Sequence, residues 1–242
     1  AATRERDKFH INKHLSKNVE LKDITDDLCV FGLFGPKSRD LLKTLSEDNF
    51  ENDQFKFGFA KFITIDGVKI WTQRLSYVGE LGYELYVDLK DAKKIYELLI
   101  EKGKDFNLSN CGMHAMDIMR MESGFLHWGH DISPEENQYQ AGLAFTISNK
   151  KDVDFIGKQA LEKIKQDKVK TRFSMFTLKE SEPGKPLLLH DEPIYDGEKI
   201  IGRSTSGNYS FNFKKNLVFG YINNDFSNEE LQNKNLFIEV EK

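Results

Sequence analysis

Short apolar runs bounded by Gly and Pro organise the first part of the chain. Residues 28–34 are apolar or small throughout, which predicts a buried strand, and Gly35-Pro36 ends the run. Pro36 suits the first turn of a helix, and one apolar face of that helix is supplied by Leu41, Leu42 and Leu45. Residues 1–15 are mostly charged, with apolar side chains at irregular helical spacing, and this pattern predicts an exposed helix.

Residues 57–88 predict a hairpin followed by a further strand. The apolar stretches on either side of Asp66-Gly67 are strand-like from Phe57 to Thr72, and this dipeptide is typical of a tight turn. A period of two gives the next strand, residues 83–87, two different faces. One face carries Tyr83, Leu85 and Val87, and the other carries Glu84 and Tyr86. Asp91 is then expected to cap a helix.

The character of the chain changes near residue 170. Before it, residues 112–123 and 156–165 predict helices, the first rich in Met and stopped by Gly124. Beyond it, short strand-like runs alternate with turns, as in a small all-β domain. These runs are residues 173–178, 186–190, 199–205, 217–222 and 236–240. We therefore expect two domains, residues 1–168 and 169–242.

Composition excludes several classes of protein. Of the 242 residues, 39% are hydrophobic, which is enough for a core and excludes a disordered chain. The net charge of -4 argues against a nucleic-acid partner, and no apolar stretch is long enough to suggest a membrane. Cys29 and Cys111 lie far apart, so neither a disulfide framework nor a zinc ribbon is expected. The absence of an initial Met, and an end inside a strand-like run, lead us to expect truncation at both ends.

The segment from Arg74 to Leu85 is the best candidate for a binding site. Gly79 and Gly82 allow a tight turn, which the carboxylates of Glu80 and Glu84 flank, with Tyr77 close by. A carboxylate can accept two parallel N–H bonds from a planar donor, such as a guanidinium or the edge of a pterin or guanine. On spacing alone, a hairpin end with surface Glu side chains remains the favoured interpretation.

Two further segments carry weaker signals. A metal site would need His127, His130 and Asp131, with His114. A loop packed by Trp128 explains these residues better, so no metal is expected. Asp117 and Arg120 are three residues apart in a helix and can pair, so this helix is expected to tie itself to the loop after Gly124. The sequence contains no GxSxG elbow, P-loop or GxGxxG motif.

A family resemblance rests on residues 33–36, 76–84, 117–124, 155–158 and 201–207. On these segments the chain resembles the tetrahydrofolate-binding aminomethyltransferase family, the T-protein of glycine cleavage and its relatives. Residues 127–132 and 141–143 look most like the C-terminal folate region of sarcosine and dimethylglycine dehydrogenases. The resemblance implies an α+β fold, in which a folate-binding domain of antiparallel sheets with helices precedes a small C-terminal β-barrel.

The resemblance also implies roles for the candidate residues. Glu84 matches the family's Glu that grips the pterin edge, and Tyr77 matches the aromatic that lines the pterin pocket. Glu80, the third candidate for cofactor binding, matches the turn and is expected to be mainly structural. Met116 stands where relatives close to the T-protein have Arg, which suits the dehydrogenase branch better. The family's catalytic Asp lies upstream of the segment that matches residues 1–7, so we assign no catalytic residue.

The function implied is a fragment of an FAD-linked sarcosine or dimethylglycine dehydrogenase or oxidase. Its folate region would transfer a one-carbon unit from an iminium to tetrahydrofolate, while FAD would lie in an N-terminal domain outside this chain. The partners are then a folate and an N-methyl amine, and the location is the cytoplasm, or the mitochondrial matrix in a eukaryote. The alternatives are a stand-alone aminomethyltransferase, a folate-dependent demethylase and a non-enzymatic folate-binding module.

Overall fold

The computed structural model describes residues 3–148, 154–167, 169–223 and 225–240. The chain forms two compact units. The first unit comprises Ala1–Ser76 and Glu80–Asn110, and the second comprises Tyr77–Gly79 and Cys111–Lys242. The short segment 77–79 therefore belongs to the second unit, although the residues on both sides of it belong to the first.

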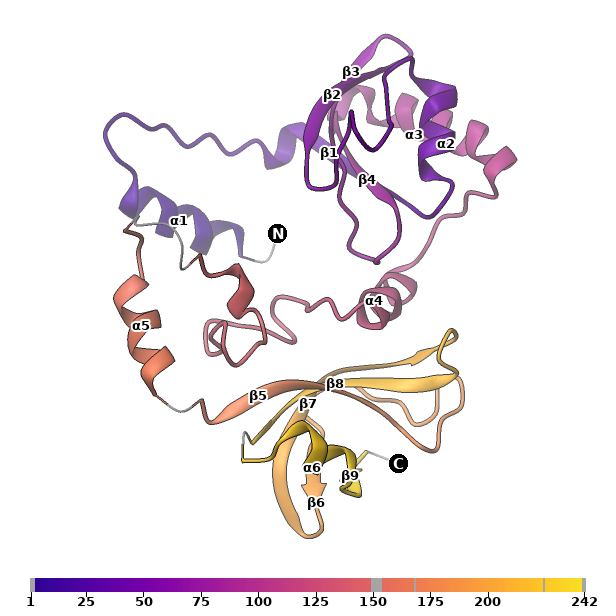
Figure 1. The fold of residues 1–242 in the computed structure, drawn as a ribbon. Helices are drawn as coiled ribbons and strands as arrows, with labels where there is room; N and C mark the ends of the chain where they lie inside the picture. Colours follow the sequence, from indigo (N-terminus) through magenta and orange to yellow (C-terminus); the bar gives the residue numbers. More distant parts are fainter. Residues whose placement is uncertain (1–2, 149–153, 168, 224, 241–242) are drawn as a thin grey trace. The chain divides into compact units, whose positions relative to one another are not determined.

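A four-stranded antiparallel sheet with the order β1-β4-β3-β2 forms the centre of the first unit. Its strands are β1 Leu28–Phe34, β2 Ala60–Ile65, β3 Val68–Gln73 and β4 Gly82–Asp88. The helices α2 (Ser38–Leu45) and α3 (Leu89–Gly103) cover one face of this sheet (Figure 1). The remaining helical elements are α1 Arg4–His14, η1 Thr25–Asp27 and η2 Lys104–Phe106.

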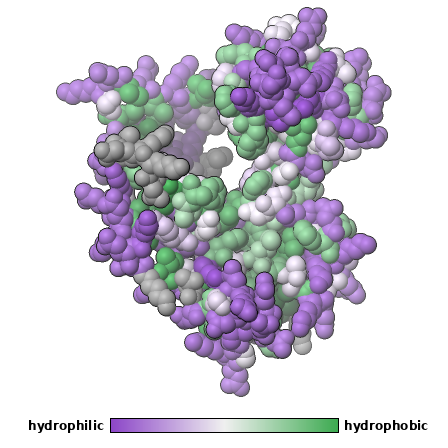
Figure 2. Space-filling view, in the orientation of Figure 1, coloured by the Kyte–Doolittle hydropathy of each residue, from purple (hydrophilic) through white to green (hydrophobic). Residues whose placement is uncertain are grey.

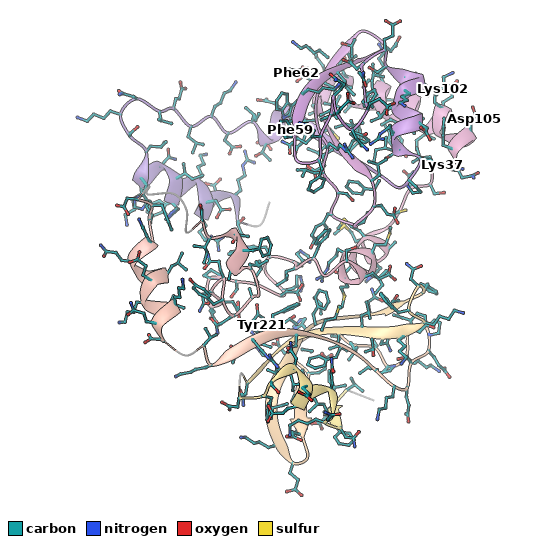
Figure 3. All side chains as sticks on the ribbon, in the orientation of Figure 1. Lys37, Phe59, Phe62, Lys102, Asp105 and Tyr221 are labelled. Atoms are coloured by element: carbon teal, nitrogen blue, oxygen red, sulfur yellow. The ribbon has the colours of Figure 1, made fainter. Side chains whose placement is uncertain are left out.

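The two faces of this sheet differ in burial. Side chains that point toward α2 and α3 form the core, among them Leu33, Ile63, Ile70, Leu85 and Val87. The opposite face, which we call the outer face, keeps Val30, Phe62 and Trp71 exposed. Figure 3 labels Phe59 and Phe62 on this side and Lys37 on the helical side. In Figure 2, hydrophobic residues interrupt the hydrophilic surface along the strand side of the unit.

The second unit is built on a five-stranded antiparallel sheet with the order β5-β8-β7-β6-β9. Its strands are β5 Thr171–Thr177, β6 Pro193–Asp196, β7 Lys199–Ser210, β8 Lys215–Asn223 and β9 Leu236–Ile238. Its helical elements are α4 Met113–Glu122, η3 Ala144–Thr146, α5 Lys158–Gln166 and α6 Asn228–Gln232. On one side of the sheet, Ile118 and Met121 of α4 pack with Leu217 and Phe219 of β8. No helix in the described part of the chain is long and apolar enough to cross a bilayer.

Most expected elements are confirmed, with several corrections. The turn at Asp66 and Gly67 is present, and both residues have positive φ. Residues 186–190 do not form a strand, and β6 lies a few residues later. Phe57 and Phe59 precede β2 and do not belong to it. Asp88, not Asp91, occupies the N-cap position of α3, and its side chain makes no capping bond.

The expected boundary between two domains is not tested by these elements. It falls at Lys168, which lies outside the described residues, as do Ala1 and Lys242 at the two ends. The division into residues 1–168 and 169–242 therefore stays a prediction.

Candidate functional site

Glu84 lies on the outer face of the first sheet, near the end of β4 where the Gly-rich turn enters the strand. It is half-buried, with Gly32 of β1 and Gln73 of β3 as its neighbours across the sheet. Because residues two apart in a strand share a face, Tyr86 lies beside it. The Tyr86 hydroxyl donates a hydrogen bond of 2.7 Å to Oε2 of Glu84.

This hydrogen bond determines how many acceptor positions of the Glu84 carboxylate remain for a ligand. Burial, together with the neighbouring Glu84 carboxylate, raises the pKa of Tyr86 to about 12, so the phenol remains a donor at neutral pH. A carboxylate has about four acceptor positions on its two oxygens, and Tyr86 uses one of them. The remaining positions can accept hydrogen bonds from a planar donor group.

A cavity of about 830 Å³ lies along the same face. Trp71, Gln73 and Tyr86 contribute side chains from the strands, and the segment before β1 contributes charged residues such as Arg4 and Asp23. Glu84 does not itself line the cavity, but it is hydrogen-bonded to Tyr86, which does. Aromatic walls of this kind suit a flat ring.

Tyr77 is held in the second unit by the loop after α4. Its hydroxyl donates to the carbonyl oxygen of Leu126 at 3.0 Å. Its ring stacks on Phe125 with 6.3 Å between the centroids and 15° between the planes. Burial raises the pKa of Tyr77, so its hydroxyl is protonated at neutral pH. Tyr77 and Glu84 belong to different units.

Glu80 is exposed and precedes β4 in the turn. The Gly residues beside it have clear structural roles. Gly79 has φ +76, and a Cβ atom placed there would lie 1.9 Å from Oγ of Ser123. This close approach agrees with the tight turn expected from the sequence.

A buried ion pair anchors the loop between α4 and residue 131. Arg120 and Asp131 are each 1% exposed and form a salt bridge through Nη1 and Oδ2. Arg120 also donates from Nε to Asp117 at 2.9 Å and from Nη1 to the carbonyl oxygen of Phe125 at 2.9 Å. The expected Asp117–Arg120 pair and the tie to the loop after Gly124 are confirmed. The sequence analysis missed Asp131, which it considered only as a metal ligand.

The histidines of this loop cluster without forming a metal site. The ring centroids of His127 and His130 are 4.5 Å apart, and His190 follows at 6.3 Å from His130. Burial, together with the charge of His130, lowers the pKa of His127. Across the residues with described positions, no three His, Cys, Asp or Glu side chains are arranged to hold a metal ion. Trp128 was expected to pack the loop, but it is 47% exposed, and the buried residue is Asp131.

Known proteins share both parts of this architecture. The GCVT N-terminal domain matches residues 1–151, and the glycine cleavage T-protein C-terminal barrel domain matches residues 172–241. Mitochondrial dimethylglycine dehydrogenase from Homo sapiens is 36% identical over 205 residues, which are 85% of this chain and 23% of that protein. An aminomethyltransferase from Anoxybacillus flavithermus is 31% identical over 227 residues, which are 94% of this chain and 61% of that protein.

A solved structure agrees with these similarities in sequence. The crystal structure of the glycine cleavage system aminomethyltransferase T from Bartonella henselae has a TM-score of 0.76 at 20% identity, covering 91% of this chain and 58% of that one. This likeness confirms the expected fold class. The chain spans about a quarter of the length of the dehydrogenases it matches. Because one family model covers residues 1–151 and a second covers residues 172–241, the chain belongs to the glycine cleavage T-protein family of aminomethyltransferases.

Proposed function

We propose that this chain binds tetrahydrofolate and serves the transfer of a one-carbon unit to it. In this proposal, Glu84 holds the pterin edge and Tyr77 lines the pterin pocket. The reduced folate supplies the nitrogen atoms that take up the carbon unit. The protein holds the pterin in one orientation, and positioning of this kind lowers the entropic part of the barrier.

The observation that supports the proposal is the burial and hydrogen bonding of the Glu84 carboxylate. Its carboxylate is half-buried on the outer face of the first sheet, where Tyr86 fixes one oxygen. Each oxygen still has a lone pair that Tyr86 does not use, so the two oxygens together can accept one hydrogen bond each from the amino group and the ring N–H of a pterin, which form a planar pair of parallel donors. Charge-assisted hydrogen bonds of this kind are roughly twice as strong as neutral ones.

The test is a titration of the chain with 5-formyltetrahydrofolate, a stable reduced folate, by isothermal calorimetry. Glu84→Gln keeps the shape of the side chain and removes its charge, so we expect the affinity to fall by about tenfold or more. Glu101→Gln provides the matched control, because Glu101 is exposed on α3 in the same unit. Equal affinity of the Glu84→Gln variant and the wild type would show that Glu84 does not grip the pterin.

The family relationship supports two enzymatic contexts equally. In one, a flavin group carried outside residues 1–242 oxidises sarcosine or dimethylglycine, and this chain receives the carbon unit from the resulting iminium. Similarity to dimethylglycine and sarcosine dehydrogenases supports this context. In the other, the protein is a stand-alone aminomethyltransferase, which the similarity to such enzymes supports.

Sequencing the gene on both sides of the region for residues 1–242 distinguishes the two contexts. A flavin-binding domain encoded upstream in the same reading frame would support the dehydrogenase context. A reading frame without such a domain would support the stand-alone enzyme. A complete protein that binds folate yet transfers no carbon unit would instead indicate a non-enzymatic folate-binding module.

A further inference from the structure

A single peptide unit connects Asp131 to Tyr77. The carbonyl oxygen of Leu126 accepts the hydrogen bond from the Tyr77 hydroxyl at 3.0 Å. The backbone N–H of His127 donates to Oδ2 of Asp131 at 2.8 Å. This carbonyl and this N–H belong to the same planar trans peptide unit, in which they point in opposite directions. The carboxylate and the phenol therefore hold one rigid plane from its two sides.

The preceding peptide unit is fixed as well. Arg120 donates from Nη1 to the carbonyl oxygen of Phe125 at 2.9 Å. The ring of Phe125 in turn stacks on the ring of Tyr77. Both peptide planes that flank Leu126 are thus oriented by the Arg120–Asp131 pair. Tyr77 contacts the segment that this pair holds, because its hydroxyl donates to the carbonyl of Leu126 and its ring stacks on Phe125.

The pair itself is firmly held. Oδ1 of Asp131 accepts hydrogen bonds from Thr205 at 2.6 Å and from Ser206 at 2.8 Å, both on β7. Nη2 of Arg120 donates to the same Ser206 hydroxyl at 2.8 Å. Because both charged groups are 1% exposed, removing one of them leaves the other buried without its partner, at a high cost. The anchor of the loop is therefore the sheet of the second unit.

We propose that Asp131 is a positioning residue for Tyr77, acting through the peptide unit between Leu126 and His127. The inference rests on the proposed function in one respect, since it affects folate only if Tyr77 lines the pterin pocket. Asp131 sets the direction of the carbonyl that receives the Tyr77 hydroxyl, and it does so without touching the ligand. Arg120 supports it by orienting the neighbouring peptide plane.

The direct test follows Tyr77 by fluorine NMR in the chain labelled with 3-fluorotyrosine. The Tyr77→Phe variant assigns its resonance. Asp131→Ala removes both carboxylate oxygens, and we expect the Tyr77 resonance to shift or broaden. Asp131→Asn removes the charge beside Arg120 but keeps an acceptor for the N–H of His127, so a folded Asp131→Asn variant should retain the wild-type resonance. Glu122→Gln is the matched control, since Glu122 also accepts hydrogen bonds from outside α4, from Ser210 of β7 and from Asn212 in the turn that follows it, and it has no hydrogen bond to residues 125–127.

A second variant keeps the test valid if Asp131→Ala does not fold. If circular dichroism shows that Asp131→Ala is unfolded, the double variant Arg120→Met, Asp131→Leu removes both charges together. Such replacements of a buried pair by apolar residues are often tolerated. The double variant still frees both peptide planes, and the same change in the Tyr77 resonance is expected. An unchanged Tyr77 resonance in a folded variant would overturn the inference.

Affinity for 5-formyltetrahydrofolate separates this inference from the proposed function. We expect Asp131→Ala and Tyr77→Phe each to weaken binding by about fivefold to tenfold, and the two together to weaken it no further. A shifted Tyr77 resonance with unchanged affinity would uphold the positioning role and refute the pterin contact of Tyr77. Additive losses of affinity would show that Asp131 acts independently of Tyr77, and would overturn the inference.

Discussion

The raised pKa of Tyr86 makes the stability of the protein depend on pH in the alkaline range. The pKa of Tyr86 is about 12 in the folded protein, mainly because of burial, whereas an unfolded tyrosine has a pKa of about 10. The folded state therefore holds the phenolic proton more tightly. Its contribution to stability is complete below a pH of about 10 and is lost as the pH rises toward 12.

Urea denaturation at a series of alkaline pH values tests this dependence. We expect the free energy of unfolding to fall less steeply with pH in Tyr86→Phe than in the wild type, because phenylalanine has no proton to lose. Tyr96→Phe is the comparison in the same unit, since Tyr96 lies on α3 away from Glu84. Identical pH profiles for the wild type and Tyr86→Phe would contradict the expectation.

Gly79 and Gly67 distinguish two costs of adding a side chain, the strain of a positive φ and the overlap with a neighbouring side chain. Both have positive φ, +76 for Gly79 and +77 for Gly67, so Ala at either position costs about 1–2 kcal/mol. Only at Gly79 would the new Cβ meet another side chain, since Gly67 has no atom within 4 Å of that position. We expect Gly79→Ala to lose about 1–3 kcal/mol more than Gly67→Ala in chemical denaturation. Equal losses would show that Ser123 moves aside freely.

The candidate site shows which contacts between residues can be predicted from the sequence and which cannot. Glu84 and Tyr86 were expected on one face because a strand alternates, and their hydrogen bond follows from that local rule. Asp117 and Arg120 were likewise paired by helical spacing. Asp131 meets Arg120 across 11 residues and meets Thr205 across 74, so no local period places it. Contacts of this kind arise only when distant segments pack.

At the level of elements, the methionines of α4 differ sharply in burial. Met121 is completely buried against β8, whereas Met113 is 69% exposed. Met121→Ala should therefore lower the free energy of unfolding by about 2–5 kcal/mol through the cavity it creates. Met113→Ala on the same helix should change it by less than about 0.5 kcal/mol. Similar losses in thermal denaturation would place the apolar face of α4 elsewhere.

Sequence patterns predict a strand at residues 186–190 that does not form, and they miss the short elements β6 and α6. In residues 186–190, Leu188 is buried, while Leu187 and Leu189 are 67% and 61% exposed, so their alternation is real. The segment nevertheless does not join the sheet, and Pro186 has no N–H to contribute to a ladder. The strand β6 has only four residues, too few for a pattern. The short helix α6 did carry a signal, the capping box of Ser227 and Glu230.

For the whole molecule, the important feature is that each unit has its own core. The core of the first unit joins β1 to β4 with α2 and α3, and all its residues belong to that unit. The clusters around Phe219 and Ile222 draw all their residues from the second unit. Sequence patterns found most strands and helices of both cores, but they missed β6 and α6, and they did not assign residues 77–79 to the second unit. That assignment depends on contacts with the loop after α4.

Separate cores predict separate cooperative behaviour, which hydrogen exchange measured by mass spectrometry can resolve. Leu85→Ala opens a cavity in the first core, so amides of β1 and β4 should exchange faster while those of β5 and β8 keep the wild-type rate. Phe219→Ala should produce the reverse pattern. Acceleration of both sheets by either substitution would show that the cores unfold as one. With separate cores, Asp131 and Glu84 variants can be interpreted independently, since the two residues belong to different units.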